Sequence, residues 1–224
     1  MKRETEPVET KAERTRKEIL KAALELFEKR GFEATTMRQI ADAAGTSVGL
    51  TYRYFSRKEE LALALYEELA ETLRERAKKI PKGGLATRFR AAMRIKLELV
   101  EPHRHAISAL FAAMVRGDEA ISIVGPATAG VRATVGEAFR IVVHGATDAP
   151  EAHHDELAGI LQSVHLAVLL VWMLDRSAKA ARTRAALEMA VVAIGAASPW
   201  LATPVGEAIL RRVHRELAVM FEEG

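Results

Sequence analysis

The chain has 224 residues, of which 49% are hydrophobic, so it can bury a substantial core and is not a disordered polypeptide. Proline and glycine are few, whereas Ala, Leu, Glu, Arg and Lys are abundant, which favours an all-α fold. The absence of cysteine excludes disulfides, thiolate metal sites and cysteine nucleophiles, and the net charge of +3 permits nucleic-acid binding without requiring it.

The N-terminal segment begins with charged residues and lacks the apolar run of a secretory signal, so we expect a cytoplasmic protein. The stretch 157–174 carries no charge and is nearly long enough to cross a membrane. Gln162, Ser163 and His165 interrupt it, and acidic residues precede it. We therefore predict a buried helix here and no membrane association.

Residues 1–11 mix both charges and show no apolar stripe, which predicts a flexible arm. A helix is predicted from about residue 15 to Gly31, a residue type suited to the left-handed conformation that ends helices. Its apolar positions recur on one face: Ile19, Ala23, Leu26 and Phe27.

Two short helices are predicted next. Thr36 and Gln39 have the spacing of a capping box, so a helix should begin at Met37 and stop at Gly45. Ser47 can cap a following helix over residues 48–54. Two short helices joined by an Ala-Gly turn are typical of the helix-turn-helix, whose second helix enters the major groove of DNA.

A longer helix is predicted from Ser56, with Glu59 completing another capping box and leucines at every fourth position. Further helices are expected at residues 85–101, 103–116, 126–143, 151–174, 178–197 and 204–222. This pattern divides the chain into an arm (1–11), a helix-turn-helix domain (12–57) and a helical bundle (58–224).

Three segments closely resemble the TetR family of bacterial transcriptional regulators: GFEATTMRQIA at 31–41, AGTSVGLTYRYF at 44–55 and KEEL at 58–61. The resemblance implies a three-helix DNA-binding head, a helical regulatory body and a homodimer formed by the last long helices. One residue departs from the family pattern. Thr51 stands directly before the first Tyr, where the family usually has an apolar residue, which puts the local packing in doubt.

The resemblance and the helix-turn-helix pattern together imply DNA contacts from nine residues: Thr36, Arg38, Ser47, Val48, Gly49, Leu50, Tyr52, Tyr54 and Lys58. Arg38 suits a guanine or a phosphate, and Val48 and Leu50 suit thymine methyl groups, with packing of the head as the alternative. A cation in the first turn of a helix opposes the helix dipole, so Lys58 has no local stabilising role and a phosphate would supply one.

The helix at 151–174 is apolar nearly all round, so we expect it to face both a ligand cavity and a partner subunit. Small residues on the next helix permit close approach in a four-helix dimer interface, with a monomer core as the alternative: Ala190, Ala193, Gly195, Ala196 and Ala197.

A hydrophobic or amphipathic effector is expected, and each wall residue proposed for its cavity is equally suited to plain core packing. The proposed wall comprises Phe89, Met93, Leu97, Phe111, Met114, Phe139, Gln162, His165 and Trp172. Four basic residues suit an anionic ligand, although a solvated helix face is preferred: Arg88, Arg90, Arg94 and Lys96.

No metal or other cofactor is expected, because His103 and His105 point to different helix faces and His153 adjoins His154. The sequence has no nucleophile elbow, phosphate loop or zinc-helix signature, so no enzymatic activity is expected. The expected protein is a repressor that binds a pseudo-palindromic double-stranded DNA operator as a homodimer and is released by a small molecule. The alternatives are an activator or ligand-enhanced repressor, a helical small-molecule carrier and a helical enzyme.

Overall fold

The structure, a computed structural model, describes residues 10–115, 121–122 and 125–221. Regular secondary structure within these ranges is helical, apart from one isolated pairing between Gly83 and Ala146. The all-α prediction is therefore confirmed. Of the predicted arm, residues 1–9 lie outside the described ranges, and so does Glu222 at the predicted end of the last helix.

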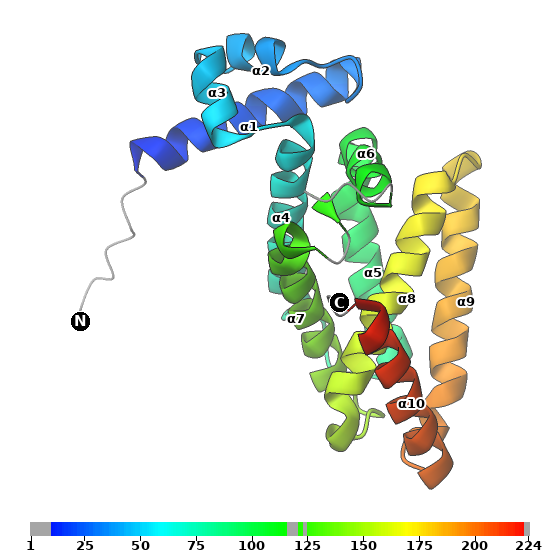
Figure 1. Cartoon of the computed structure of the whole chain (residues 1–224). Coiled ribbons are helices and arrows are strands. Elements are labelled where there is room, and N and C mark those ends of the chain that lie inside the picture. Colours follow the sequence, from blue (N-terminus) through cyan, green and yellow to red (C-terminus); the bar gives the residue numbers. More distant parts are fainter. Residues whose placement is uncertain (1–9, 116–120, 123–124, 222–224) are drawn as a thin grey trace, which may run out of the picture.

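Among the described residues, three helices form a head at one end of the molecule and seven further α-helices form the body (Figure 1). The head contains α1 (Lys11–Arg30), α2 (Met37–Ala43) and α3 (Val48–Tyr54). The body contains α4 (Lys58–Ala77), α5 (Leu85–Val100), α6 (Arg104–Val115), α7 (Ala129–His144), α8 (His154–Leu174), α9 (Ala181–Ala197) and α10 (Pro204–Phe221). Short 3-10 turns adjoin several of them: η1 (Glu101–His103), η3 (Pro126–Thr128), η4 (Glu151–His153), η5 (Ala178–Ala180) and η6 (Ser198–Trp200).

The first helix begins earlier than predicted. Thr10 accepts a hydrogen bond from the Glu13 amide, and the Glu13 carboxylate accepts one from the Thr10 amide, so a capping box starts α1 at Lys11. Three of the four residues in this first turn are charged, so apolar periodicity did not reveal it. Gly31 ends the helix with φ 82° and ψ 157°, a positive φ but not the left-handed helical conformation that was predicted.

The predicted cap of α4 was wrong. Arg57, not Ser56, precedes the first helical residue, and no side chain caps this end. The Ser56 amide and hydroxyl both donate to the carboxylate of Glu60, and Glu59 takes no part in these bonds. The acidic group thus lies one residue further along than the capping-box spacing requires, which moves the helix start to Lys58.

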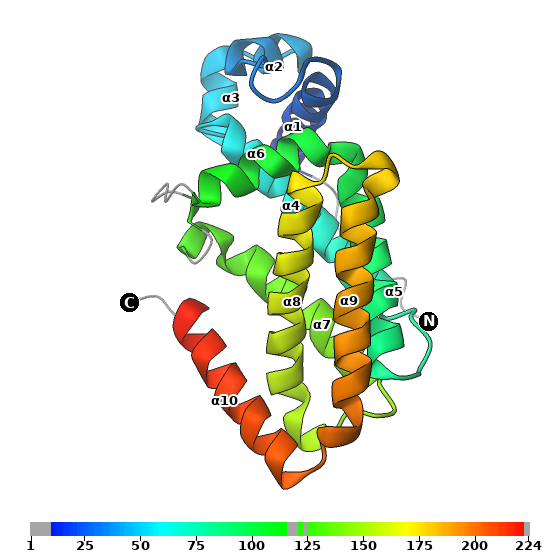
Figure 2. The ribbon, with the colours of Figure 1, turned by 90° about the vertical axis from the view of Figure 1, so that its right-hand side faces the viewer.

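One apolar core runs through the head and the body. It joins Ile19 and Phe27 of α1 to Leu61 of α4 and continues to Phe89 of α5 and Trp172 of α8. Within the body α4 packs against α5, α6 and α7, while α8 packs against α7, α9 and α10. Residues 151–174 form a helical segment long and apolar enough to cross a membrane. In the fold this segment is a central helix of the bundle (Figure 2).

Arg88 on α5 joins three segments of the body. Its guanidinium donates to the carbonyls of Val142 at 2.7 Å, Ile141 at 2.9 Å and Ile80 at 2.6 Å, and also to the Pro81 carbonyl. The predicted solvated face is therefore wrong for this residue, which is buried. These carbonyls lie near the ends of α7 and α4, where helices leave backbone acceptors without intrahelical partners.

Candidate functional site

The caps of the two short helices are formed as predicted. In α2 the Gln39 amide donates to the Thr36 hydroxyl at 3.3 Å, and the Thr36 amide donates to the Gln39 side chain at 2.9 Å. In α3 the Leu50 amide donates to the Ser47 hydroxyl at 3.1 Å. Gly45 turns the chain between the helices with φ 64°, which favours glycine. The helix-turn-helix geometry thus follows from short-range interactions.

The head exposes several residues that were predicted to contact DNA. Arg38 on α2 and Gly49 and Tyr52 on α3 are exposed, whereas Val48 and Leu50 are half-buried. Tyr54 is half-buried and packs against the core. In Figure 1 α2 lies at the end of the molecule opposite α10, so this surface is open to a large partner.

Thr51 is accommodated by a local hydrogen-bond network. Its side chain is buried, and its hydroxyl donates to the Ser47 carbonyl at 3.2 Å. The same oxygen lies 2.8 Å from the Thr46 hydroxyl, from which it accepts. A hydroxyl whose donor and acceptor functions are both used can be buried at little cost. The departure from the family pattern thus leaves the head well packed.

Lys58 has a structural role that the sequence did not reveal. Its ammonium donates to the backbone carbonyl of Phe32 at 2.7 Å and to that of Glu33 at 3.4 Å. It also lies 4.7 Å from the centre of the Phe32 ring. These contacts stabilise the cation without a phosphate, while a DNA contact of Lys58 stays a prediction. Lys58 ties the start of α4 to the segment between α1 and α2.

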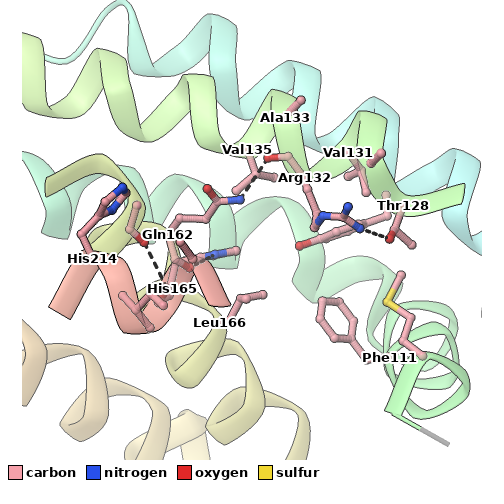
Figure 3. A pocket seen from close by; sticks show the side chains of 17 residues that line it. Phe111, Thr128, Val131, Arg132, Ala133, Val135, Gln162, His165, Leu166 and His214 are labelled. Carbon is pink, nitrogen blue, oxygen red and sulfur yellow. Dashed lines mark hydrogen bonds between the residues drawn. The ribbon is translucent and has the colours of Figure 1, made fainter. Parts of the chain in front are cut away.

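A cavity of about 380 Å³ lies in the body. Its wall contains Tyr66 of α4, Phe111 of α6, Val135 of α7 and His165 of α8, and α10 closes one side with His214 (Figure 3). The remaining wall residues are Met114, Thr128, Ala129, Val131, Arg132, Ala133, Gly159, Gln162, Ser163, Leu166, Leu217 and Ala218. The wall is mostly apolar with a few polar groups, which is typical of small-molecule sites.

Four of the nine residues predicted for the cavity lie in its wall: Phe111, Met114, Gln162 and His165. The other five described residues, Phe89, Met93, Leu97, Phe139 and Trp172, lie outside it. Four of these five are buried core residues, and Leu97 is half-buried against the core. Tyr66, Arg132 and His214 were not predicted, because their places in the wall depend on how α4, α7 and α10 pack within the body.

Hydrogen bonds order the polar side of the cavity. The Gln162 amide donates to the Arg132 carbonyl at 3.0 Å, and the Arg132 guanidinium donates to the Thr128 hydroxyl at 2.6 Å (Figure 3). Gly136 makes room for this arrangement, because a Cβ there would lie 3.0 Å from the side-chain oxygen of Gln162. These contacts hold α7 and α8 in a defined register at the cavity.

Lys96 and His165 are both buried in the body, and His165 belongs to the cavity wall whereas Lys96 does not. Lys96 is fully buried with its amine 4.0 Å from the centre of the Tyr66 ring, so the predicted solvated position is wrong. Burial lowers the pKa of Lys96 to about 7. Burial, and secondarily the charge of Lys96, lowers the pKa of His165 to about 3. Of the other two basic residues, Arg90 pairs with Glu188 of α9 and Arg94 is exposed.

Helix α6 connects the cavity with the head. Phe111 and Met114 lie in the cavity wall, while α6 and η1 also contact α1. Trp172 of α8 braces this connection, because its indole donates to the Glu101 carboxylate at 2.6 Å and the Arg104 guanidinium lies 4.4 Å from its ring centre. Arg104 also donates to the Trp172 carbonyl at 2.6 Å. Trp172 therefore joins α8 to the start of α6.

The outer face of α8 and α9 carries exposed apolar side chains. Met189 and Val192 of α9 and Leu170 and Leu174 of α8 are more than half exposed. Of the small residues predicted for a dimer interface, Ala193, Gly195, Ala196 and Ala197 are exposed, while Ala190 packs partly against the core. Exposed apolar patches of this kind are typical of interaction surfaces.

No cluster of three or more potential metal-ligating side chains is found among the described residues. His144 and His154 form a close pair with 3.1 Å between their Nδ1 atoms. His153 lies 3.6 Å from Glu156 and 3.8 Å from Glu207.

Comparison with known proteins identifies the family. Residues 19–65 match the model of bacterial regulatory proteins of the tetR family. The transcriptional regulator TtgR of Pseudomonas putida is 44% identical over 61 residues, a match that spans 27% of this chain and 29% of that protein. The transcriptional repressor KstR of Rhodococcus jostii is 31% identical over 165 residues, which span 72% of this chain and 74% of KstR.

Solved structures extend the similarity to the body. A tetR-family regulator from Streptomyces coelicolor has a TM-score of 0.58 and 25% identity, covering 90% of this chain and 88% of its own. The repressor FadR of Thermus thermophilus, solved with lauroyl-CoA, has a TM-score of 0.57 and 21% identity, covering 80% of this chain and 92% of its own. From the helix-turn-helix head, the helical body and the match to KstR over most of its length, we conclude that the chain belongs to the TetR family of bacterial regulatory proteins.

Proposed function

We propose that this protein is a ligand-responsive transcriptional repressor that binds a pseudo-palindromic operator as a homodimer and releases it when a small molecule fills the cavity. The proposal rests above all on α6, which contacts α1 of the head and contributes Phe111 and Met114 to the cavity wall. A ligand that displaces either side chain acts on a helix in contact with the head. KstR and FadR, both called repressors, favour repression over activation.

In this proposal α3 is the recognition helix, and Arg38 and Tyr52 offer exposed polar groups to bases and phosphates. Two heads reach successive major grooves when they stand about 34–36 Å apart, so a ligand that favours another spacing weakens DNA binding. By linkage, the operator then weakens ligand binding by the same factor. A cytoplasmic location follows from this function.

The first test is the selection of bound sequences from random duplex DNA. We expect the wild type to enrich a palindrome and the double variant Arg38→Ala with Tyr52→Ala to enrich none, because the variant loses two proposed DNA contacts. Both side chains are exposed, so their loss should leave the fold intact. Arg212→Ala, an exposed arginine of α10, is the matched control and should enrich the wild-type palindrome. Affinity for this palindrome should fall steeply as salt increases.

If the wild type enriches no sequence at low salt, with or without cell extract as a source of ligand, the regulator proposal fails and a helical small-molecule carrier becomes the better explanation. Enrichment only in the presence of extract would instead indicate a ligand-enhanced repressor. Increased transcription from the selected operator would indicate an activator.

A further inference from the structure

Two histidines leave ring nitrogens without hydrogen-bond partners at the cavity. In the part of the chain that the structure describes, His165 Nε2 and His214 Nδ1 are buried and unpaired, and both residues belong to the cavity wall. Figure 3 shows them on α8 and α10, on the same side of the cavity as Gln162. Buried polar atoms normally have a partner, so an unpaired atom at a cavity indicates where a ligand is polar.

The hydrogen-bonding character of His165 follows from its other nitrogen. Nδ1 lies 3.0 Å from the backbone carbonyl oxygen of Gln162. A carbonyl oxygen can only accept, so Nδ1 carries the proton and Nε2 of the neutral ring carries a lone pair. Because the pKa of His165 is lowered to about 3, the ring stays neutral at physiological pH. His165 Nε2 is therefore a fixed hydrogen-bond acceptor.

We propose that the cavity takes an uncharged amphipathic ligand whose hydroxyl group, an alcohol or a phenol, donates a hydrogen bond to His165 Nε2. This inference rests on the ligand-responsive function proposed above and specifies the chemistry of its effector. Val131, Val135 and Leu166 supply apolar wall for the rest of the molecule. The ligand thus has an apolar body and a hydroxyl at the end that faces α8.

A carboxylate is a poor match for the same position. It has no proton to donate, and its lone pairs would face that of His165 Nε2. The nearby amine of Lys96 does not belong to the cavity wall and lies against the Tyr66 ring, so it offers a carboxylate no direct hydrogen bond. An ether of the same shape also lacks the required donor. Matched hydroxyl, ether and carboxylate compounds therefore test the proposal.

Binding is measured by calorimetry at pH 7 with two sets of probes: 2-naphthol, 2-methoxynaphthalene and 2-naphthoate, and 1-octanol, methyl octyl ether and octanoate. In the wild type we expect the hydroxyl compound of at least one set to bind about tenfold more tightly than its ether and its carboxylate. His165→Leu should abolish this preference, and His165→Gln, which restores an acceptor oxygen, should recover part of it. His105→Leu, an exposed histidine of α6, is the matched control and should keep the wild-type preference.

The nitrogen-15 resonance of His165 Nε2 provides a readout that a purely structural role would not affect. It should show an unprotonated nitrogen in the free protein and shift when the hydroxyl probe binds. Equal affinity for hydroxyl and ether, tighter binding of a carboxylate, or no binding of any probe would overturn the proposal. None of these results alters the operator selection, so the hydroxyl proposal and the regulator proposal fail separately.

Discussion

At the scale of single residues, the buried amine of Lys96 makes the stability of the fold depend on pH. Its pKa is about 7 in the folded chain, against an ordinary value of 10.5. As pH falls from 10.5 to 7, the unfolded chain takes up a proton that the folded chain does not, so folding becomes less favourable. Below pH 7 both states carry the proton and the penalty is constant.

Replacing Lys96 with Met should therefore stabilise the protein at neutral pH. We expect Lys96→Met to raise the free energy of unfolding by about 2–4 kcal/mol at pH 7, with the gain shrinking steadily towards pH 10. Urea denaturation at pH 7, 8.5 and 10 measures the change, with the exposed Lys79→Met as control. A gain that does not vary with pH would mean that packing, not the amine, is responsible.

Lys58 supports the head through its bonds to the carbonyls of Phe32 and Glu33. Lys58→Met keeps the apolar stem against the Phe32 ring but loses these bonds, so we expect a loss of about 1–2 kcal/mol in stability. Thermal unfolding in the absence of DNA is the measurement, with the exposed Lys82→Met as control. A variant as stable as wild type that binds operator with a smaller salt dependence would contradict this structural role and favour a phosphate contact.

The sequence predicted side-chain hydrogen bonds whose two partners are close along the chain. Thr36 and Ser47 each cap a helix by accepting a hydrogen bond from the amide three residues further along, and both caps were predicted correctly. Lys58 bonds to Phe32, which is 26 positions away along the chain, and Arg88 bonds to Val142, which is 54 positions away. Such contacts depend on tertiary packing, so the pattern of charges on the predicted helices did not reveal them.

At the scale of elements, the predicted helices correspond closely to those observed, because apolar periodicity and the Gly and Pro breaks define them locally. The register of α3 over Val48–Tyr54 agrees with its prediction. What periodicity does not specify is which apolar face meets which. Phe139 and Trp172 were predicted for the cavity, but Phe139 packs against Phe89 and Trp172 against the start of α6.

The joint between α5 and α7 depends on a glycine. A Cβ at Gly145 would overlap the guanidinium of Arg88, which cannot move without losing its bonds to four carbonyls. We expect Gly145→Ala to destabilise the fold by about 2 kcal/mol or more, as overpacking does elsewhere. Gly130→Ala on α7 meets no atom within 4 Å and should be neutral or stabilising. Equal melting temperatures for the two variants would contradict this role of Arg88.

At the scale of the whole molecule, the exposed face of α8 and α9 bears on assembly. The side chain of Met189 is 72% exposed and that of Val192 is 68% exposed. If this face forms the proposed dimer, Met189→Glu with Val192→Glu places four like charges in a buried interface and should yield monomers. Light scattering after size-exclusion chromatography measures the mass. Val115→Glu, an equally exposed apolar position on α6, should remain dimeric.

The continuous apolar core provides a packed connection for the proposed communication between cavity and head. Ile19 and Phe27 of the head belong to the same apolar cluster as Phe111 and Leu166 of the cavity wall. A displacement at the wall therefore acts on closely packed neighbours, which transmit strain efficiently. The sequence had suggested a domain boundary near residue 57, and this core bridges it.

The two tryptophans of the chain occupy opposite surroundings, which makes them built-in optical reporters. Trp172 of α8 is buried against the start of α6, whereas Trp200, in η6 between α9 and α10, is 66% exposed. The emission spectrum should contain a short-wavelength component from the first and a long-wavelength, readily quenched component from the second. Changes where α8 meets the start of α6 and changes at the turn between α9 and α10 can then be followed separately in one unlabelled sample.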